Sequence, residues 1–171
     1  MIYGLNHLAL SVADMKRTLE FYTGVLGLRL DGLFPMHGVP GAVHAFLDLG
    51  DGRQLSFVRF RSPKDRIEGV TYPAHPGRSS AVGTMHHVAL NVRDEAALLA
   101  VRERVTASGR PCAGPIDHGF CRSIYFKGPD EEQLEVSWFT RALGADEMDA
   151  ETVRAVGLSP AELTAMTRGN A

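Results

Sequence analysis

One pattern occurs twice in this chain, and that repeat constrains the fold more than any other feature. The segment His7-Leu-Ala-Leu-Ser-Val12 matches His87-Val-Ala-Leu-Asn-Val92, at an offset of 80 residues. An aspartate follows each copy at the same distance, Asp14 in the first and Asp94 in the second. A Gln-Leu pair recurs at positions 54 and 133, at nearly the same offset. A chain of 171 residues that repeats once in this way is predicted to hold two copies of one supersecondary unit.

Each copy is predicted to be a βαβββ unit. Alternating apolar and polar residues indicate strands, and an aspartate ahead of an apolar stripe with helical spacing indicates the start of a helix. In the first copy we expect a strand at 4–12, a helix from Asp14 to about Thr23, and strands at 28–34, 43–49 and 54–61. In the second we expect a strand at 85–92, a helix from Asp94 to Ser108, and strands at 111–117, 121–127 and 133–139. The fold class is therefore predicted to be α+β.

Four segments are expected to form a single fused domain. The first module covers residues 1–62, and a linker or crossover loop rich in proline, glycine and charge covers 63–84. The second module covers 85–140. A helical C-terminal extension covers 141–171, where Ser159-Pro160-Ala161-Glu162 is a capping box with proline at the first helical position. We expect this extension to pack on the molecule or to form a dimer contact.

Composition and charge exclude several classes of function. Eighteen basic and 20 acidic residues give a net charge of −2, which offers no electrostatic attraction to nucleic acid or to an anionic membrane. No apolar run approaches the roughly 18 residues of a spanning helix, and the N-terminus lacks the charged and apolar regions of a signal peptide. The two cysteines are too few for a disulfide framework. We therefore expect a cytoplasmic protein whose partners are small molecules.

Strand alternation separates a polar face from an apolar face in both modules. His7 and His87 share their faces with small and polar residues, whereas the adjacent His86 points to the opposite face. In the later strands of the second module, Tyr125 and Glu135 fall on the polar face. The apolar faces are expected to pack on the helices, so the polar faces are expected to line a cavity. This places His7, His87, Tyr125 and Glu135 in one predicted site.

A metal ion explains the two histidines and the carboxylate together. A carboxylate inside a concave sheet is costly unless it is paired or bound to a metal. A pseudo-two-fold arrangement of the modules would bring His7 and His87 to one place, where Glu135 joins them. Two histidines and one carboxylate with open positions form the ligand set of non-haem Fe(II) oxygenases. Fe(II) is the expected cofactor, and Mn(II), Zn(II), Co(II) and Ni(II) stay open as alternatives.

These motifs resemble the vicinal oxygen chelate superfamily over roughly residues 4–140. Members of that superfamily pair βαβββ modules into a cupped mixed sheet around a metal site. The resemblance assigns ligand positions to His7, Ser56, His87 and Glu135. Ser56 departs from glyoxalase I and methylmalonyl-CoA epimerase, which place Glu or Gln there, so three protein ligands and more open positions remain. Gln54, on the same face as Ser56, is an alternative fourth ligand.

A more specific resemblance is to type I extradiol ring-cleavage dioxygenases. The residues that carry it are Ile116-Asp117-His118, Ile124-Tyr125, Pro129 and Glu135. The chain departs from the family pattern at Gly128 and Glu131, in the turn between the strands predicted at 121–127 and 133–139. The resemblance implies that His118 or His75 acts as acid and base and that Tyr125 hydrogen-bonds the bound substrate oxygen. It implies a catechol-like aromatic and O2 as substrates.

Three functions stay open on the sequence alone. The first is an Fe(II)-dependent extradiol-type dioxygenase, which the combination of Ser56 with Tyr125 and His118 favours. The second is a glyoxalase-like or epimerase-like lyase or isomerase, which needs a fourth ligand and a redox-inactive metal. The third is a non-catalytic binding or resistance protein that sequesters a small molecule. We also expect a homodimer, because paired modules often build sites across subunits and a swapped arrangement can draw ligands from two chains.

Overall fold

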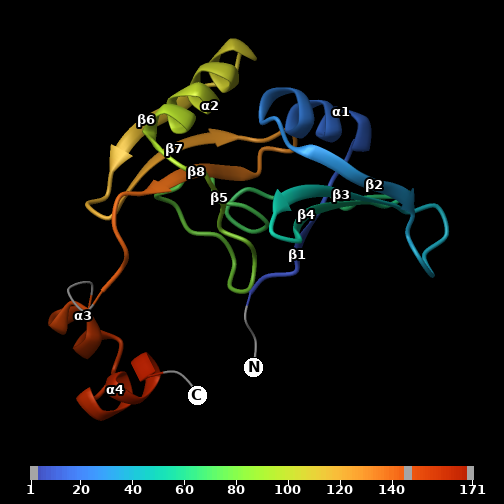
Figure 1. Cartoon of the computed structure of the whole chain (residues 1–171). Coiled ribbons are helices and arrows are strands. Elements are labelled where there is room, and N and C mark those ends of the chain that lie inside the picture. The colour runs from blue at the N-terminus through green and yellow to red at the C-terminus, as the bar shows by residue number, and fades with distance from the viewer. Residues whose placement is uncertain (1–3, 145–147, 169–171) are drawn as a thin grey trace.

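The computed structural model describes residues 4–144 and 148–168. The parts of the predicted first module and C-terminal extension that fall on residues 1–3, 145–147 and 169–171 lie outside the described residues. Within the described chain, two successive units are followed by two short helices (Figure 1). The predicted α+β fold of two βαβββ modules with helices after them is confirmed.

The two modules contain matching elements. The first consists of β1 (His7–Ser11), α1 (Met15–Leu19), the π-helical turn η1 (Glu20–Val25), β2 (Arg29–Pro35), β3 (Val43–Gly50) and β4 (Arg53–Arg59). The second consists of β5 (Val88–Asn91), α2 (Glu95–Ala107), β6 (Cys112–Asp117), β7 (Cys121–Lys127) and β8 (Gln133–Phe139). The C-terminal helices are α3 (Ala150–Ala155) and α4 (Pro160–Arg168). None of the helices in the described chain is long and apolar enough to cross a membrane.

The repeated aspartates begin the two main helices in the same way. The Asp14 carboxylate accepts a hydrogen bond from the Arg17 amide at 3.1 Å, and the Asp94 carboxylate accepts one from the Ala97 amide at 2.8 Å. Each carboxylate satisfies one of the amides that the first turn leaves without a partner, which stabilises a helix by about 1 kcal/mol. The predicted capping box before α4 is also present, because the Ser159 amide donates to the Glu162 carboxylate at 2.8 Å.

The strands form two four-stranded sheets with the same topology. Sheet 1 has the order β1-β4-β3-β2, and sheet 2 has the order β5-β8-β7-β6. In each sheet the first strand pairs in parallel with the last, and the other pairs are antiparallel. Helices α1 and α2 lie side by side over one side of the two sheets (Figure 1). The opposite side of each sheet, which we call its open face, carries the polar residues of the alternating strands.

Both modules contribute to one apolar core beneath the helices. Tyr22, Phe57, Leu98 and Leu134 are fully buried there, together with other side chains of both sheets. Burying a side chain of this size stabilises the fold by about 2 kcal/mol. The core therefore joins the modules through their helix-covered sides and leaves the open faces free of core packing.

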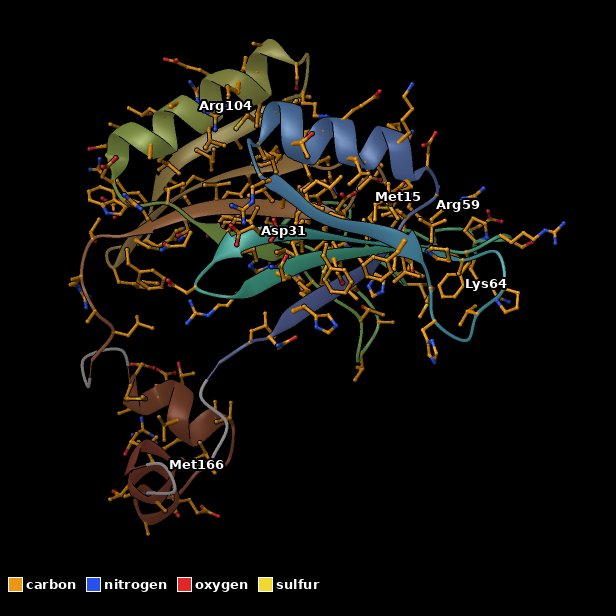
Figure 2. All side chains as sticks on the ribbon, turned by 45° about the vertical axis from the view of Figure 1, so that its right-hand side comes forward. Met15, Asp31, Arg59, Lys64, Arg104 and Met166 are labelled. Carbon is orange, nitrogen blue, oxygen red and sulfur yellow. The ribbon has the colours of Figure 1, made fainter. Side chains whose placement is uncertain are left out.

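Polar contacts also lock the modules together at the turn between β7 and β8. Asp130 accepts hydrogen bonds from the Ala13 amide at 3.0 Å and from the Arg17 guanidinium at 2.6 Å. The buried Tyr22 hydroxyl donates to Glu132 at 2.8 Å. Burial raises the pKa of the Glu132 carboxyl. On the helix side, Arg104 lies on α2 (Figure 2). Its guanidinium donates a hydrogen bond to the Val25 carbonyl at 2.8 Å.

Gly128 and Glu131, the two residues that depart from the dioxygenase pattern, lie in this turn. Its local geometry explains why these residue types fit there. Glu131 adopts a φ of 63°, a left-handed conformation that glycine adopts more easily. A Cβ at Gly128 would overlap the Glu132 carboxylate, which Tyr22 and the Asp130 amide hold in place. Gly128 therefore leaves room for a buried carboxylate that links the modules, and Glu131 takes the left-handed position of the turn.

We predict that Gly128→Ala destabilises the protein by about 1–3 kcal/mol, because the new methyl group displaces the Glu132 carboxylate from its partners. Urea unfolding followed by circular dichroism measures the change. Gly24→Ala is the matched control, since a Cβ at Gly24 has no neighbour within 4 Å, and it is expected to cause no loss. Equal stabilities for Gly128→Ala and the wild type would contradict the tight fit of the turn.

Candidate metal centre

Glu135 stands on the open face of sheet 2 with its carboxylate firmly held. It lies on β8 and is only 7% exposed. The fully buried Ser123 of β7 donates a hydrogen bond to its Oε1 at 2.5 Å, and the Ser137 hydroxyl lies 3.1 Å from that of Ser123. A hydrogen bond to a charged carboxylate is short and strong. Ser123 therefore fixes the Glu135 carboxylate and leaves its Oε2 for a second partner.

That second partner is His87, which precedes β5 directly. Its Nε2 lies 3.2 Å from Glu135 Oε2. The strand predicted at 85–92 begins only at Val88, because pairing with β8 starts at Leu134. His87 is therefore placed by the end of the crossover loop, but its side chain still points to Glu135, as the alternation predicts.

A short hydrogen-bond relay assigns the protonation of His87. The Nε2 of His86 lies 3.0 Å from the carbonyl oxygen of Arg78, so this nitrogen must carry a proton. When His86 is neutral, its Nδ1 has a lone pair and accepts the Nδ1 proton of His87, 2.8 Å away. His87 Nε2 is left with a lone pair that faces the Glu135 carboxylate. Two such acceptors at 3.2 Å repel each other unless a proton or a metal cation lies between them.

The donor set therefore fits a divalent metal. Neutral imidazole nitrogen and carboxylate oxygen are ligands for Fe(II), Mn(II) and Zn(II). Histidine ligands usually donate their second ring proton to another group, and His86 takes that proton here. A proton on His87 would also satisfy the pair, as an ion pair with Glu135. His87 and Glu135 are thus the two residues on sheet 2 that would hold a metal.

Tyr125 and His118 lie beside the His87–Glu135 pair. Tyr125 is directly opposite Glu135 in the β7–β8 register. Its hydroxyl lies 3.0 Å from His118 Nε2. Burial, and then the charge of Glu135, raise the pKa of the Tyr125 hydroxyl. Tyr125 therefore stays protonated near neutral pH, and the exposed His118 is in position to exchange a proton with it.

His7 occupies the corresponding position on sheet 1, away from the other two predicted ligands. It is exposed at the start of β1, where its Nδ1 lies 2.7 Å from the Asn6 side-chain oxygen. Within one chain, the described residues contain no group of three or more His, Cys, Asp or Glu side chains that could hold a metal ion. The single chain thus joins His87 with Glu135 and presents His7 separately.

The neighbours of His7 on sheet 1 differ from those of His87. Ser56 of β4 is fully buried, and Gln54 pairs with His7 in the parallel register. The Ser56 hydroxyl and the Gln54 Oε1 are buried without a hydrogen-bond partner. The nearby His44 has a pKa lowered mainly by burial and then by the charge of His7. The buried polar atoms of this half of the open face are less fully hydrogen-bonded than those around Glu135 on sheet 2.

His75, the other predicted acid–base residue, lies in the crossover loop between the modules. Its Nδ1 accepts from the Gly77 amide at 3.0 Å, and its carbonyl accepts from the Arg78 amide at 2.9 Å. The Arg78 carbonyl in turn holds His86. His75 is thus connected to the site through the backbone of its loop, and its role stays a prediction.

The sequence analysis did not predict two contacts of this site, Ser123 with Glu135 and His86 with His87. Ser123 lies on the polar face that strand alternation identifies, so its partnership with Glu135 was open to prediction. The role of His86 was not, because His86 points away from His87 in a regular strand, and the contact exists only where the strand has not yet begun.

Comparison with known protein families identifies the superfamily of this chain. Residues 4–136 match the sequence model of the Glyoxalase/Bleomycin resistance protein/Dioxygenase superfamily. The chain belongs to this superfamily. The resemblance to the vicinal oxygen chelate proteins that the sequence predicts is thereby confirmed.

Individual relatives in the superfamily carry different activities in their names. The chain is 26% identical over 157 residues to the putative ring-cleaving dioxygenase MhqA of Bacillus subtilis, a match that covers 92% of this chain and 46% of that protein. The chain thus spans about half the length of that relative. It is 29% identical over 149 residues to a lactoylglutathione lyase of Pseudomonas aeruginosa, covering 78% of this chain and 81% of the lyase.

A solved structure with the same fold contains a metal. It is a mutant form of the fosfomycin resistance protein FosX of Listeria monocytogenes, in complex with Mn(II) and 1S,2S-dihydroxypropylphosphonic acid. The TM-score is 0.56 at 20% identity, with 86% of this chain and 98% of that chain covered. At this identity the likeness establishes the fold, and it shows that the superfamily fold accommodates a divalent metal.

We predict that His86→Leu weakens metal binding by about 10- to 100-fold without abolishing it, because His87 loses the acceptor that fixes its tautomer. Titration of metal-free protein with Zn(II) against a competing chelator measures the affinity. His37→Leu, an exposed loop histidine, is the control and is expected to leave the affinity unchanged. An unchanged affinity in His86→Leu would refute the relay.

Proposed function

We propose that two copies of this chain form a divalent-metal dioxygenase that cleaves the ring of a catechol-like aromatic. The observation that carries the proposal is the His87–Glu135 pair, which presents two metal-ligating groups to one point and has the Tyr125–His118 pair beside it. The metal ligands in this proposal are His7, His87 and Glu135.

The two-chain arrangement follows from where the ligands stand. His7 and His87 are both exposed in the single chain. β1 and β5 are edge strands of their sheets, and an edge strand offers unpaired backbone groups to another strand. When β1 of one copy lies along β5 of the other, the repeat brings His7 next to the partner copy's His87–Glu135 pair. A two-fold axis would then create two equivalent sites.

The ligand set leaves room for substrates. When bound, Fe(II) would hold the two diol oxygens and O2 next to each other. In the overall reaction the ring C–C bond beside the diol breaks, and both atoms of O2 enter the product. O2 accepts the electrons that the diol loses, so no other reductant is consumed. We propose Fe(II) for this reason, ahead of Mn(II), Zn(II), Co(II) and Ni(II).

The protein groups around the ligands hold the carboxylate and move protons. Ser123 keeps Glu135 in place, and the His86 relay keeps a lone pair on His87 Nε2. Tyr125 donates a hydrogen bond to a substrate oxygen, and His118 removes a diol proton and returns it later. His75 belongs to the loop at this end of the site and is the second candidate for that proton transfer. The name of the B. subtilis relative supports the same chemistry.

One observation favours a lyase or isomerase as the second candidate. The Gln54 Oε1 is buried without a partner, and Gln54 pairs with His7 in the sheet register. This oxygen could serve as a fourth ligand, which would suit a redox-inactive metal and the activity named in the P. aeruginosa relative. Gln54→Ala separates the candidates: ring cleavage is expected to survive the substitution, whereas lyase chemistry requires the fourth ligand.

Oxygen consumption tests the proposal. We predict that protein loaded anaerobically with Fe(II) takes up O2 when a catechol is added and forms a yellow ring-fission product. A panel of catechols with an oxygen electrode and absorbance detection provides the measurement. EDTA-treated protein and the Glu135→Ala variant are the controls and are expected to be inactive. Absence of uptake by protein that retains Fe(II) would contradict the dioxygenase and favour the lyase.

A further inference from the structure

An aromatic shelf lies beside His7 on the open face of sheet 1. It consists of Phe34 on β2 and of His44 and Phe46 on β3. The rings of Phe34 and Phe46 are stacked, with centroids 5.7 Å apart and planes 18° apart. The ring of His44 is 4.3 Å from that of Phe46, and the ring of His7 meets Phe46 edge-on at 5.6 Å. Phe34 remains 46% exposed, although large aromatic side chains favour burial.

Buried polar atoms without partners adjoin the same shelf. The His44 Nε2 and the Ser56 hydroxyl are both buried and make no hydrogen bond. Ser56 is fully buried and stands opposite Phe46 in the β3–β4 register. Buried polar groups in folded proteins are nearly always hydrogen-bonded. These two atoms therefore indicate that the shelf receives a ligand with hydroxyl groups.

The two basic strand residues on the open faces are already engaged. Among the strand residues of the described chain, Arg29 and Lys127 are the basic side chains on the open faces. Arg29 pairs with Asp31 at 2.8 Å and with Asp48 at 2.9 Å. Lys127 donates to the Pro73 carbonyl at 3.1 Å. Neither guanidinium nor ammonium is left without a partner to receive an anionic substituent, and Asp48 and Glu135 add negative charge to the surface.

Building on the proposed function, we infer that the aromatic shelf binds the ring of an uncharged dihydroxybenzene and discriminates against diols that carry a carboxylate. The ring packs on Phe34 and Phe46. A diol hydroxyl pairs with His44 Nε2, which satisfies the buried nitrogen. In the proposed two-chain site β1 of one copy lies along β5 of the other, so the shelf beside His7 would form an apolar wall next to the metal ligands.

Binding without turnover tests this inference. Protein loaded with Zn(II), which does not support oxygen chemistry, is titrated with catechol and with 3,4-dihydroxybenzoate in a calorimeter. We expect catechol to bind at least about tenfold more tightly, because the carboxylate finds no free cation on the strands of the open faces and meets like charge. Equal or tighter binding of 3,4-dihydroxybenzoate would overturn the proposed selectivity.

Two substitutions on neighbouring positions locate the binding surface. Phe34→Ala is expected to weaken catechol binding about threefold to tenfold, because it removes half of the stacked pair. Leu33→Ala is the matched control, since Leu33 is similarly exposed and points to the opposite face of β2. Equal affinities of the two variants would overturn the assignment of the shelf. His44→Phe keeps a ring of similar size and is expected to weaken binding about tenfold.

The failure of this inference and the failure of the proposed function are distinguishable. Selective binding of catechol to Zn(II)-loaded protein, with no O2 uptake by the Fe(II)-loaded protein, would support the shelf and reject the dioxygenase. O2 uptake with carboxylated diols that is insensitive to Phe34→Ala would support the dioxygenase and reject the shelf. A Zn(II)-loaded protein that binds neither diol would reject the shelf.

Discussion

The contact between His87 and Glu135 needs a positive charge, which either a proton or a metal ion supplies. The proposed chemistry of the site depends on this requirement. Ser123 fixes one carboxylate oxygen, and the Arg78 carbonyl fixes the tautomer of His87 through His86. Both groups then present lone pairs to the same point, 3.2 Å apart. With the proton of His87 on Nδ1 the arrangement is repulsive until a second proton or a metal cation balances it, and a divalent metal would take each lone pair as a ligand. The neighbouring hydrogen bonds thus hold two groups in place that a cation would stabilise.

The repeat explains how one scaffold supplies two different halves of a site. Glu135 and Tyr125 face each other on sheet 2, and the equivalent positions on sheet 1 hold Ser56 and Phe46. The second module therefore provides the carboxylate and the phenol, and the first provides a histidine and an apolar surface. A shared core holds the helix-covered sides of the two modules together, and the locked turn around Asp130 reinforces it. Both open faces are then directed away from the core, where a second copy would meet them in the proposed arrangement.

Local patterns in the sequence predict much of this arrangement. The helix caps at Asp14 and Asp94 and the positions of Glu135 and Tyr125 depend on neighbours close in the chain or on strand alternation, and the structure has them as predicted. The separation of His7 from His87 was not predictable in this way, because it depends on how the two modules pack through their helices. The contact of His86 with His87 depends on a strand that starts three residues later than the alternation suggests. Side-chain periodicity predicts neither the separation of His7 from His87 nor the contact of His86 with His87.

A mixed dimer tests the central claim, that two chains complete each metal site, most directly. His7→Ala and Glu135→Ala chains carrying different affinity tags are co-expressed, and the heterodimer is purified through both tags and analysed for bound metal. In a two-chain site one of the two centres of the heterodimer keeps both His7 and Glu135, so we predict about one metal ion per heterodimer and none in either homodimer. A heterodimer without metal would contradict the account, because ligands drawn from a single chain cannot be restored by mixing.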